Sequence, residues 1–178
     1  TVGESIDSAQ LPTQVDIVTA LHACDTATDD AIRFALYKQA QFIVLAPCCH
    51  QEIDDQVEAK RKEGTLPAQR SWAATLGSGL LRHRLTDIVT DSLRAAALEA
   101  LGYDVDVVEF VSPEATARNL MLRAELRQTG AGARDAARAA YGRYRALAGE
   151  WAVRPALEDL LGDAWPPFDE PWSGSGAP

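Results

Sequence analysis

The sequence lacks any apolar run long enough to cross a membrane. A spanning helix needs about 18 or more consecutive apolar residues, and no stretch of the 178 residues approaches that length. The first residues, 1–4, also lack the basic and then apolar pattern of a signal peptide. We therefore expect a protein that has no membrane partner.

Cysteine and positive charge are both scarce. The three cysteines are an odd number and two of them are adjacent, so they cannot form a disulfide framework without one left over. A reducing cytoplasm is the compartment that suits them. With 17 Lys and Arg against 26 Asp and Glu, the net charge is −9. Bulk charge therefore does not drive nucleic-acid binding, and any RNA contact must be local.

Apolar material, in contrast, is sufficient for a core. The composition is 47% hydrophobic and 24% charged, which suits one globular domain and excludes a collagen-like or wholly disordered chain. Two apolar runs, 16–23 and 41–46, predict strands, and the helical spacing of 26–39 between them predicts a connecting helix. Such a βαβ unit is typical of a parallel sheet buried on both faces, with ligands at the C-terminal ends of its strands.

The rest of the chain continues the alternation of helices and strands. Mixed charge predicts a solvated helix and then a loop over 51–70, and apolar spacing predicts a long core-facing helix over 80–101. Alternating polar and apolar residues predict an antiparallel pair of strands at 103–111 and 119–126. One or two helices are expected within 130–162.

The two apolar strands end in distinctive motifs, LHACDTATD at 21–29 and APCCH at 46–50. These residues resemble class I S-adenosylmethionine-dependent methyltransferases, in the methyltransferase-like group with LHAC[DG] and PCC[HY] strand ends. VEFVS at 108–112 and NLMLRA at 119–124 extend the resemblance, which covers roughly residues 1–125. Eukaryotic tRNA 2′-O-methyltransferases that act on the acceptor stem are more distantly similar, with Gly in place of Asp25.

The resemblance implies an α/β fold with part of a Rossmann-like sheet. The class I strand order is 3-2-1-4-5-7-6, and the four strands here would be strands 4, 5, 7 and 6, with strand 7 antiparallel and helices flanking the sheet. They form the C-terminal half of that sheet. No G-x-G-x-x-G turn follows an apolar strand, so we expect the N-terminal half to be missing from this sequence.

This interpretation divides the chain and leaves an edge strand. Residues 1–128 would be the C-terminal part of a methyltransferase domain, 129–164 a helical extension and 165–178 a disordered tail. The strand at 16–23 would lack its neighbour and expose its backbone ladder groups and apolar faces. An open edge strand is a template for pairing with another chain. We therefore expect either a partner that supplies the missing half or self-association through this edge.

The resemblance also implies a cofactor and a set of site residues. S-adenosylmethionine would bind beside Leu21, His22 and Ala23. Methyl transfer needs an aligned acceptor and, where the acceptor loses a proton, a base; Asp25 would be the base or orienting carboxylate, and His22 a second proton acceptor. The structural alternative is that His22 only packs and that Asp25 caps the following helix.

Four residues are predicted to contact substrate: Cys48, Cys49, His50 and Asn119. A solvent-exposed helix-start position for His50 and a structural role for Asn119 are the alternatives. The two cysteines and His50, together with Cys24 and His22 on the adjacent strand end, also suggest a soft-ligand site for zinc. Structural zinc motifs favour C-x-x-C, however, and a buried free cysteine behaves as a small hydrophobe. From the spacing we therefore expect no metal.

The predicted function is S-adenosylmethionine-dependent methyl transfer to an RNA nucleophile. The stretch 134–145 suits either an RNA-facing patch or a solvated helix face. Its arginines and tyrosines are Arg134, Arg138, Tyr141, Arg143, Tyr144 and Arg145. A non-catalytic half-Rossmann module for protein interaction or regulation is the alternative function. A zinc- or thiol-dependent redox protein is a third.

Overall fold

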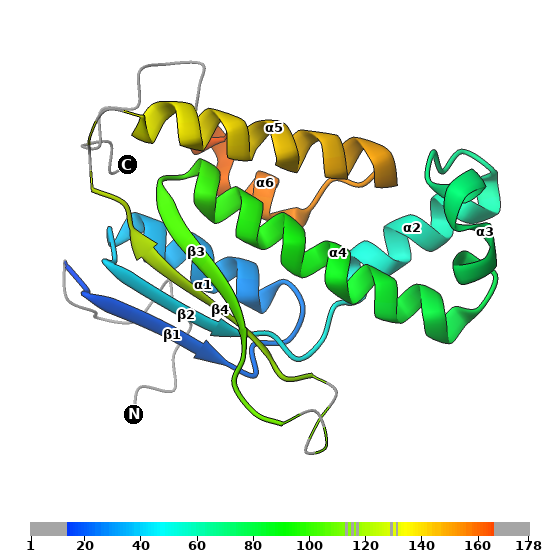
Figure 1. The fold of residues 1–178 in the computed structure, drawn as a ribbon, viewed down its shortest axis with the longest axis horizontal. Helices are drawn as coiled ribbons and strands as arrows, with labels where there is room; N and C mark the ends of the chain where they lie inside the picture. Colours follow the sequence, from blue (N-terminus) through cyan, green and yellow to red (C-terminus); the bar gives the residue numbers. More distant parts are fainter. Residues whose placement is uncertain are drawn as a thin grey trace.

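A computed structural model describes residues 14–112, 114, 116, 118–128, 130 and 132–165. Its strands and helices follow the predicted order, with one additional short helix at 69–76, and Figure 1 shows their arrangement. The elements are β1 (Ile17–Leu21), α1 (Ala27–Tyr37), β2 (Phe42–Ala46), α2 (Gln51–Glu63), α3 (Gln69–Leu76), α4 (Gly79–Ala100), β3 (Tyr103–Glu109), β4 (Leu120–Leu126), α5 (Ala133–Trp151), α6 (Ala156–Leu161) and a 3-10 turn at Gly162–Ala164.

The four strands form one mixed sheet in the order β1-β2-β4-β3. β1 and β2 are parallel, with Ile17 opposite Phe42 and Leu21 opposite Ala46. β4 lies between β2 and β3 and is antiparallel to both. This is the predicted arrangement of strands 4, 5, 7 and 6 of a class I sheet, with the strand next to the edge reversed. The predicted fold class is confirmed.

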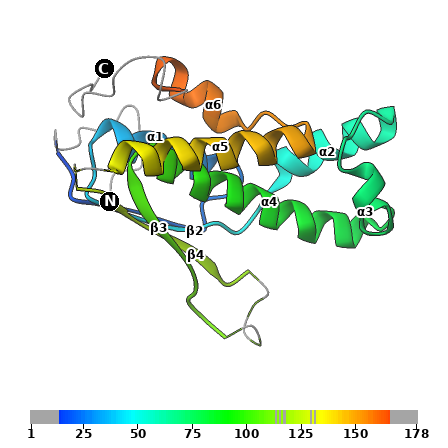
Figure 2. The ribbon, with the colours of Figure 1, turned by 45° about the horizontal axis from the view of Figure 1, so that its top comes forward.

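Helices cover only one face of this sheet in the described part of the chain, as Figure 2 shows. Alternate side chains such as Val18, Ile43 and Leu122 are buried beneath the helices. On the other face, Ile17 and Leu21 are 55% and 64% exposed. The expectation of a sheet buried on both faces is wrong for these residues, and the exposed apolar faces expected for the strand at 16–23 are confirmed. The connections β1-α1-β2 and β2-α4-β3 advance in the same direction along the sheet, and right-handed crossovers then place both helices on one side.

β1 is an edge strand, as the sequence predicted. Among the described residues, β2 is its only partner strand. Its outer edge therefore presents backbone N–H and C=O groups of the kind that pair with another chain. Self-association through this edge stays a prediction.

Two helical regions refine the expected organisation. The helix and loop expected over 51–70 are confirmed as α2 and residues 64–68. The helix α3 that follows was not expected, because its two turns are too few to give a clear apolar period. Its Leu76 is buried, and the ring of Trp72 lies 6.1 Å from that of Trp151 at the end of α5. The region after 130 forms α5, which packs along α4 (Figure 2), and the short α6.

The end of the described chain packs against α5. The Trp165 ring makes edge contacts with Tyr141 and Tyr144, at centroid distances of 5.3 and 4.7 Å. Residues 166–178, most of the expected disordered tail, lie outside the described residues. Within the described ranges, no helix combines the length and apolar character that a membrane span requires.

Candidate functional site

Two loops meet at the C-terminal ends of β1 and β2. One follows β1 and carries residues 22–26, and the other follows β2 and carries residues 47–50. Backbone hydrogen bonds join them: His22 N donates to Ala46 O at 3.2 Å, and Asp25 N donates to Cys49 O at 3.2 Å. The two sequence motifs, separated by 16 residues, are therefore brought into direct contact.

The loop after β1 has an unusual backbone. His22 and Asp25 both adopt left-handed conformations, with φ of 57° and 51°. For residues other than glycine this costs on the order of 1–3 kcal/mol each, so surrounding contacts must hold the loop. Two of them are clear: Thr28 Oγ1 donates to Ala23 O at 2.8 Å, and Arg94 Nη2 donates to Asp25 O at 2.8 Å. The loop is thus fixed from both α1 and α4.

The Asp25 carboxylate binds the N-terminus of α2. Its Oδ1 accepts hydrogen bonds from Gln51 N at 2.9 Å and from Glu52 N at 3.0 Å. A negative charge at this position is favourable because the first N–H groups of a helix have no partner within the helix. Asp25 therefore does cap a helix, but the helix is α2, across the site, and not α1, which follows it in the chain.

The predicted cofactor-binding residues lie at the open end of β1. Leu21 and His22 are exposed, and Ala23 is partly buried. They are accessible to a ligand above the strand end, next to the loop that contains Asp25. Their roles in cofactor binding and catalysis stay predictions.

His50 is turned into the protein and is only 3% exposed. Its Nε2 lies 2.7 Å from Asp91 Oδ1 and its Nδ1 lies 3.3 Å from Asp87 Oδ1, both on α4. Burial lowers the pKa of the imidazole, but the nearby carboxylates of Asp87 and Asp91 outweigh burial and raise the pKa above its usual value. His50 is a helix-start residue, as one alternative held, but a buried one with its ring engaged inside the fold.

Asn119 lies just before β4, away from the paired loops. It is 5% exposed, and its Nδ2 donates to Val111 O at 3.0 Å, while Phe110 N donates to Asn119 O at 3.0 Å. These bonds close the end of the β3-β4 pair. They fit the structural alternative for Asn119, and its contact with substrate stays a prediction.

A charged network beneath the loops was not predicted from the sequence. Arg94 on α4 is 3% exposed and makes two hydrogen bonds of 2.9 Å with the carboxylate of buried Asp29. Arg118 lies 3.1 Å from Asp87 on the same helix and 3.0 Å from His50 Nδ1. The signal was present in α4, where Asp87, Asp91 and Arg94 recur at spacings of four and three along a helix expected to face the core.

Glu52 lies beside this network, in a small pocket that Asp29, Arg94 and Tyr144 also line. Burial, and then the negative charge of Asp29, raise the pKa of Glu52 from 4.5 to about 7. The folded protein therefore keeps a proton that the unfolded chain loses between about pH 4.5 and 7. In this window stability falls as pH rises, because the folded state binds the proton more tightly.

The variant Glu52→Gln should remove this part of the pH dependence. We expect the free energy of unfolding to fall less between pH 4.5 and 7 than in the wild type, because glutamine stays neutral throughout. Urea denaturation at a series of pH values measures the difference. The control is Glu63→Gln, an exposed residue at the end of α2, and a pH dependence equal in all three proteins would contradict the account.

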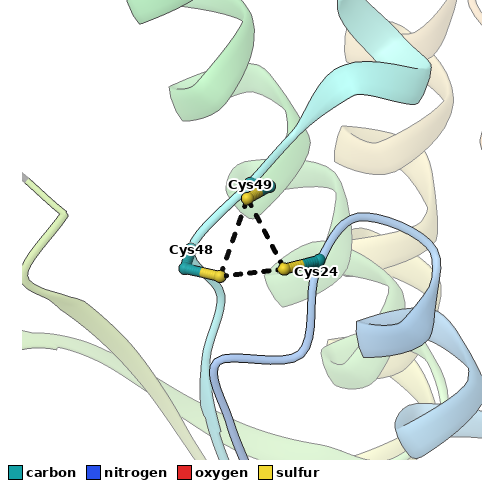
Figure 3. A group of neighbouring side chains, drawn as sticks. All are labelled: Cys24, Cys48 and Cys49. Carbon is teal, nitrogen blue, oxygen red and sulfur yellow. Dashed lines mark hydrogen bonds between the residues drawn. The ribbon is translucent and has the colours of Figure 1, made fainter.

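The three cysteines of the chain form one cluster between the two loops. Figure 3 shows their side chains pointing toward one another, with Sγ–Sγ distances of 3.4 Å for Cys24 and Cys48, 3.7 Å for Cys48 and Cys49, and 3.6 Å for Cys24 and Cys49. Cys24 and Cys49 are exposed and Cys48 is partly buried. Burial, followed by hydrogen bonds with its two neighbours, raises the pKa of the Cys48 thiol to about 12.

The sheet order and the paired strand-end loops define an α/β protein with part of a Rossmann-like methyltransferase fold. Residues 1–56 match the model of a family described as a methyltransferase domain. In the described part of that range lie β1, α1, β2 and both loops. Comparisons with curated proteins and with solved structures found no match. The family match supports methyl transfer as the chemistry of this part of the chain.

Proposed function

We propose that this chain takes part in the transfer of a methyl group from S-adenosylmethionine to a nucleophile on RNA. The observation that carries the proposal is that the methyltransferase-domain match spans both strand-end loops, which backbone hydrogen bonds hold together. In open α/β sheets, ligands bind outside the carboxyl ends of the parallel strands. The matched residues and the expected binding edge therefore coincide.

The side chains at this edge suit a cationic methyl donor. S-adenosylmethionine supplies an electrophilic methyl group on a positively charged sulfonium. Leu21 offers an exposed apolar surface at the end of the strand that leads into the Asp25 loop, and the whole chain carries a net charge of −9. Leu21, His22 and Ala23 would line the donor site, and the carboxylate would orient the acceptor or accept its proton.

Asp25 is well placed for this role because its position is fixed. Its backbone is held by Cys49 and Arg94, and one carboxylate oxygen is anchored on the first turn of α2. Preorganisation of this kind matters because transfer requires the acceptor in line with the bond that breaks. His22, exposed on the same loop, is the second candidate for proton transfer.

The RNA acceptor rests on the similarity of the strand ends to tRNA 2′-O-methyltransferases. Exposed arginines on α5, including Arg134 and Arg145, are available for phosphate contacts. With a net charge of −9, such contacts would have to be local rather than spread over the surface.

Replacing Asp25 by Asn tests the proposal. We expect transfer of labelled methyl groups from S-adenosylmethionine to total RNA by the full-length protein to fall about 100-fold, the size of a lost acid-base contribution. Asparagine keeps an oxygen that can accept the bonds from α2, so the variant separates the charge from the helix cap. The assay also counts label in protein and in small metabolites.

The matched control is Asp55→Asn, because Asp55 is an exposed carboxylate on α2 that contacts only Gln51 among the interactions described for it. It should transfer at the wild-type rate. Equal rates in the two variants would remove Asp25 from the chemistry, and label found only in protein or metabolites would overturn the RNA acceptor.

A non-catalytic interaction module is the second candidate. The open sheet face, with Ile17 and Leu21 more than half exposed, favours it because such surfaces mark contacts with other proteins. This candidate predicts no transfer of label into any fraction, so the same assay distinguishes the two.

A further inference from the structure

The three-cysteine cluster lies within the proposed methyl-transfer site, since Cys48 and Cys49 are predicted substrate contacts and Cys24 directly precedes Asp25. Cys24 comes from the loop after β1, and Cys48 and Cys49 come from the loop after β2 (Figure 3). Among the described residues, they are the one group of three possible ligands whose donor atoms lie within 4.8 Å of one another. No other cysteine exists in the chain, so every thiol of the protein is gathered at this point.

The spacing of the sulfurs matches one face of a zinc tetrahedron. In a tetrahedral site with Zn–S bonds of about 2.3 Å, neighbouring sulfurs lie about 3.8 Å apart. The three distances observed are 3.4, 3.6 and 3.7 Å. An ion about 2.3 Å from all three sulfurs would sit about 1 Å out of their plane. Only a small outward movement of the side chains is needed to admit it.

The adjacent pair is not an obstacle in this fold, although the sequence spacing argued against a metal. Cys48 and Cys49 follow Pro47 in an irregular segment between β2 and α2, where successive side chains need not point to opposite sides as they do in a strand. Their sulfurs lie 3.7 Å apart and both face Cys24. The third ligand comes from a loop that is bonded to theirs through the Asp25 and Cys49 backbones.

We propose that Cys24, Cys48 and Cys49 bind one zinc ion as thiolates, with a fourth position open to an outside ligand. Binding forms three Zn–S bonds and releases the three thiol protons to solvent, and no oxidant or reductant is required. Cys24 and Cys49 are exposed, so the remaining position faces solvent. Three protein ligands with an open fourth position are typical of catalytic rather than structural zinc. Water, or a donor atom of a substrate, would occupy it.

The experiment measures zinc in the untagged protein, purified under reducing conditions. We expect about one zinc ion per chain, and release of that zinc when a thiol reagent modifies the cysteines. Substitution by Co²⁺ should give the intense thiolate-to-cobalt absorption of a sulfur-rich tetrahedral site. Because the chain has only three cysteines, the thiol count reports on this cluster alone.

Cys24→Ser and Cys49→Ser test the ligands one at a time. Both positions are exposed, so the fold should survive, which far-ultraviolet circular dichroism checks. Each should weaken zinc binding by more than the roughly 10–100-fold seen when only a supporting residue around a metal is lost. His83→Gln is the control, because it removes another potential ligand type outside the cluster and should keep the full zinc content.

The result that would overturn the proposal is a reduced protein with three titratable thiols that takes up neither zinc nor cobalt at equimolar concentration. Zinc retained at the wild-type level in both serine variants would overturn it as well. The cobalt titration uses the unaltered protein, so this test stands even if a variant does not fold. It is also separate from methyl transfer, which is measured by label and not by metal content.

Discussion

Replacing Arg94 by Met should lower the free energy of unfolding by about 3–5 kcal/mol, the cost of leaving a buried charge without its partner. Arg94 and Asp29 are 3% and 4% exposed and joined by two hydrogen bonds of 2.9 Å. Arg94 also donates to the backbone oxygen of Asp25 at 2.8 Å. The variant therefore leaves the buried Asp29 carboxylate without its partner. It also removes a hydrogen bond that holds the loop of the candidate catalytic residue Asp25.

Chemical denaturation measures this loss, with Arg123→Met as the matched control. Arg123 pairs with Asp106 at 3.4 Å, but the two side chains are 57% and 71% exposed. Exposed pairs contribute at most about 1 kcal/mol, so the control should remain close to the wild type. Adding Asp29→Asn to Arg94→Met should recover part of the stability, because no buried charge is then left unpaired. Equal losses of unfolding free energy in Arg94→Met and Arg123→Met would contradict the role of burial.

The variant Ile43→Ala should be the second most damaging change, with a loss of about 2–5 kcal/mol. Ile43 is fully buried at the centre of β2, between β1 and β4 and beneath the helices. Removing its side chain loses apolar burial and leaves a cavity that a central strand cannot close. Urea denaturation, with the midpoint and slope both recorded, gives the change in the free energy of unfolding.

The same substitution at Ile17 provides the control. Ile17 lies on β1 and faces the open side of the sheet, where it is 55% exposed. Ile17→Ala should cost less than about 1 kcal/mol. If the two variants were destabilised equally, the sheet would have to be covered on both faces, and the one-sided core described here would be wrong.

The fold was predictable because its signals are local and strong. Apolar runs at 16–23 and 41–46 predicted β1 and β2, and alternation after Gly102 predicted β3 and β4 with their antiparallel pairing. The open second face was not predictable from these runs. An apolar strand such as 41–46 has the same appearance whether one or both faces are covered, and only the positions of the helices decide between the two.

The site was predictable in its location and less so in its details. The motifs at 21–29 and 46–50 indicated two strand ends that share one edge, and the structure joins them. That Asp25 would cap α2 instead of α1 depends on a contact across the site, which sequence distance does not show. The inward turn of His50 likewise depends on Asp87 and Asp91, which lie about 40 positions further along the chain.

The cysteine cluster was likewise not predictable from the sequence, because its members come from two separate loops. Motif spacing argued against a metal because adjacent cysteines differ from the C-x-x-C pattern. That pattern describes ligands that come from one tight turn, whereas here two loops supply them. The geometry of Cys24, Cys48 and Cys49 could therefore be read only once β1 and β2 were placed side by side.

Under the proposed function, the loops after β1 and β2 form the binding site for the methyl donor. Hydrogen–deuterium exchange of the full-length protein, with and without saturating S-adenosylmethionine, tests this directly. We expect the cofactor to slow exchange at the backbone amides of residues 21–26 and 48–52, and to leave exchange at amides on the exposed face of α5 unchanged. Protection confined to other parts of the chain, or unchanged exchange in both loops when the cofactor is bound, would contradict it.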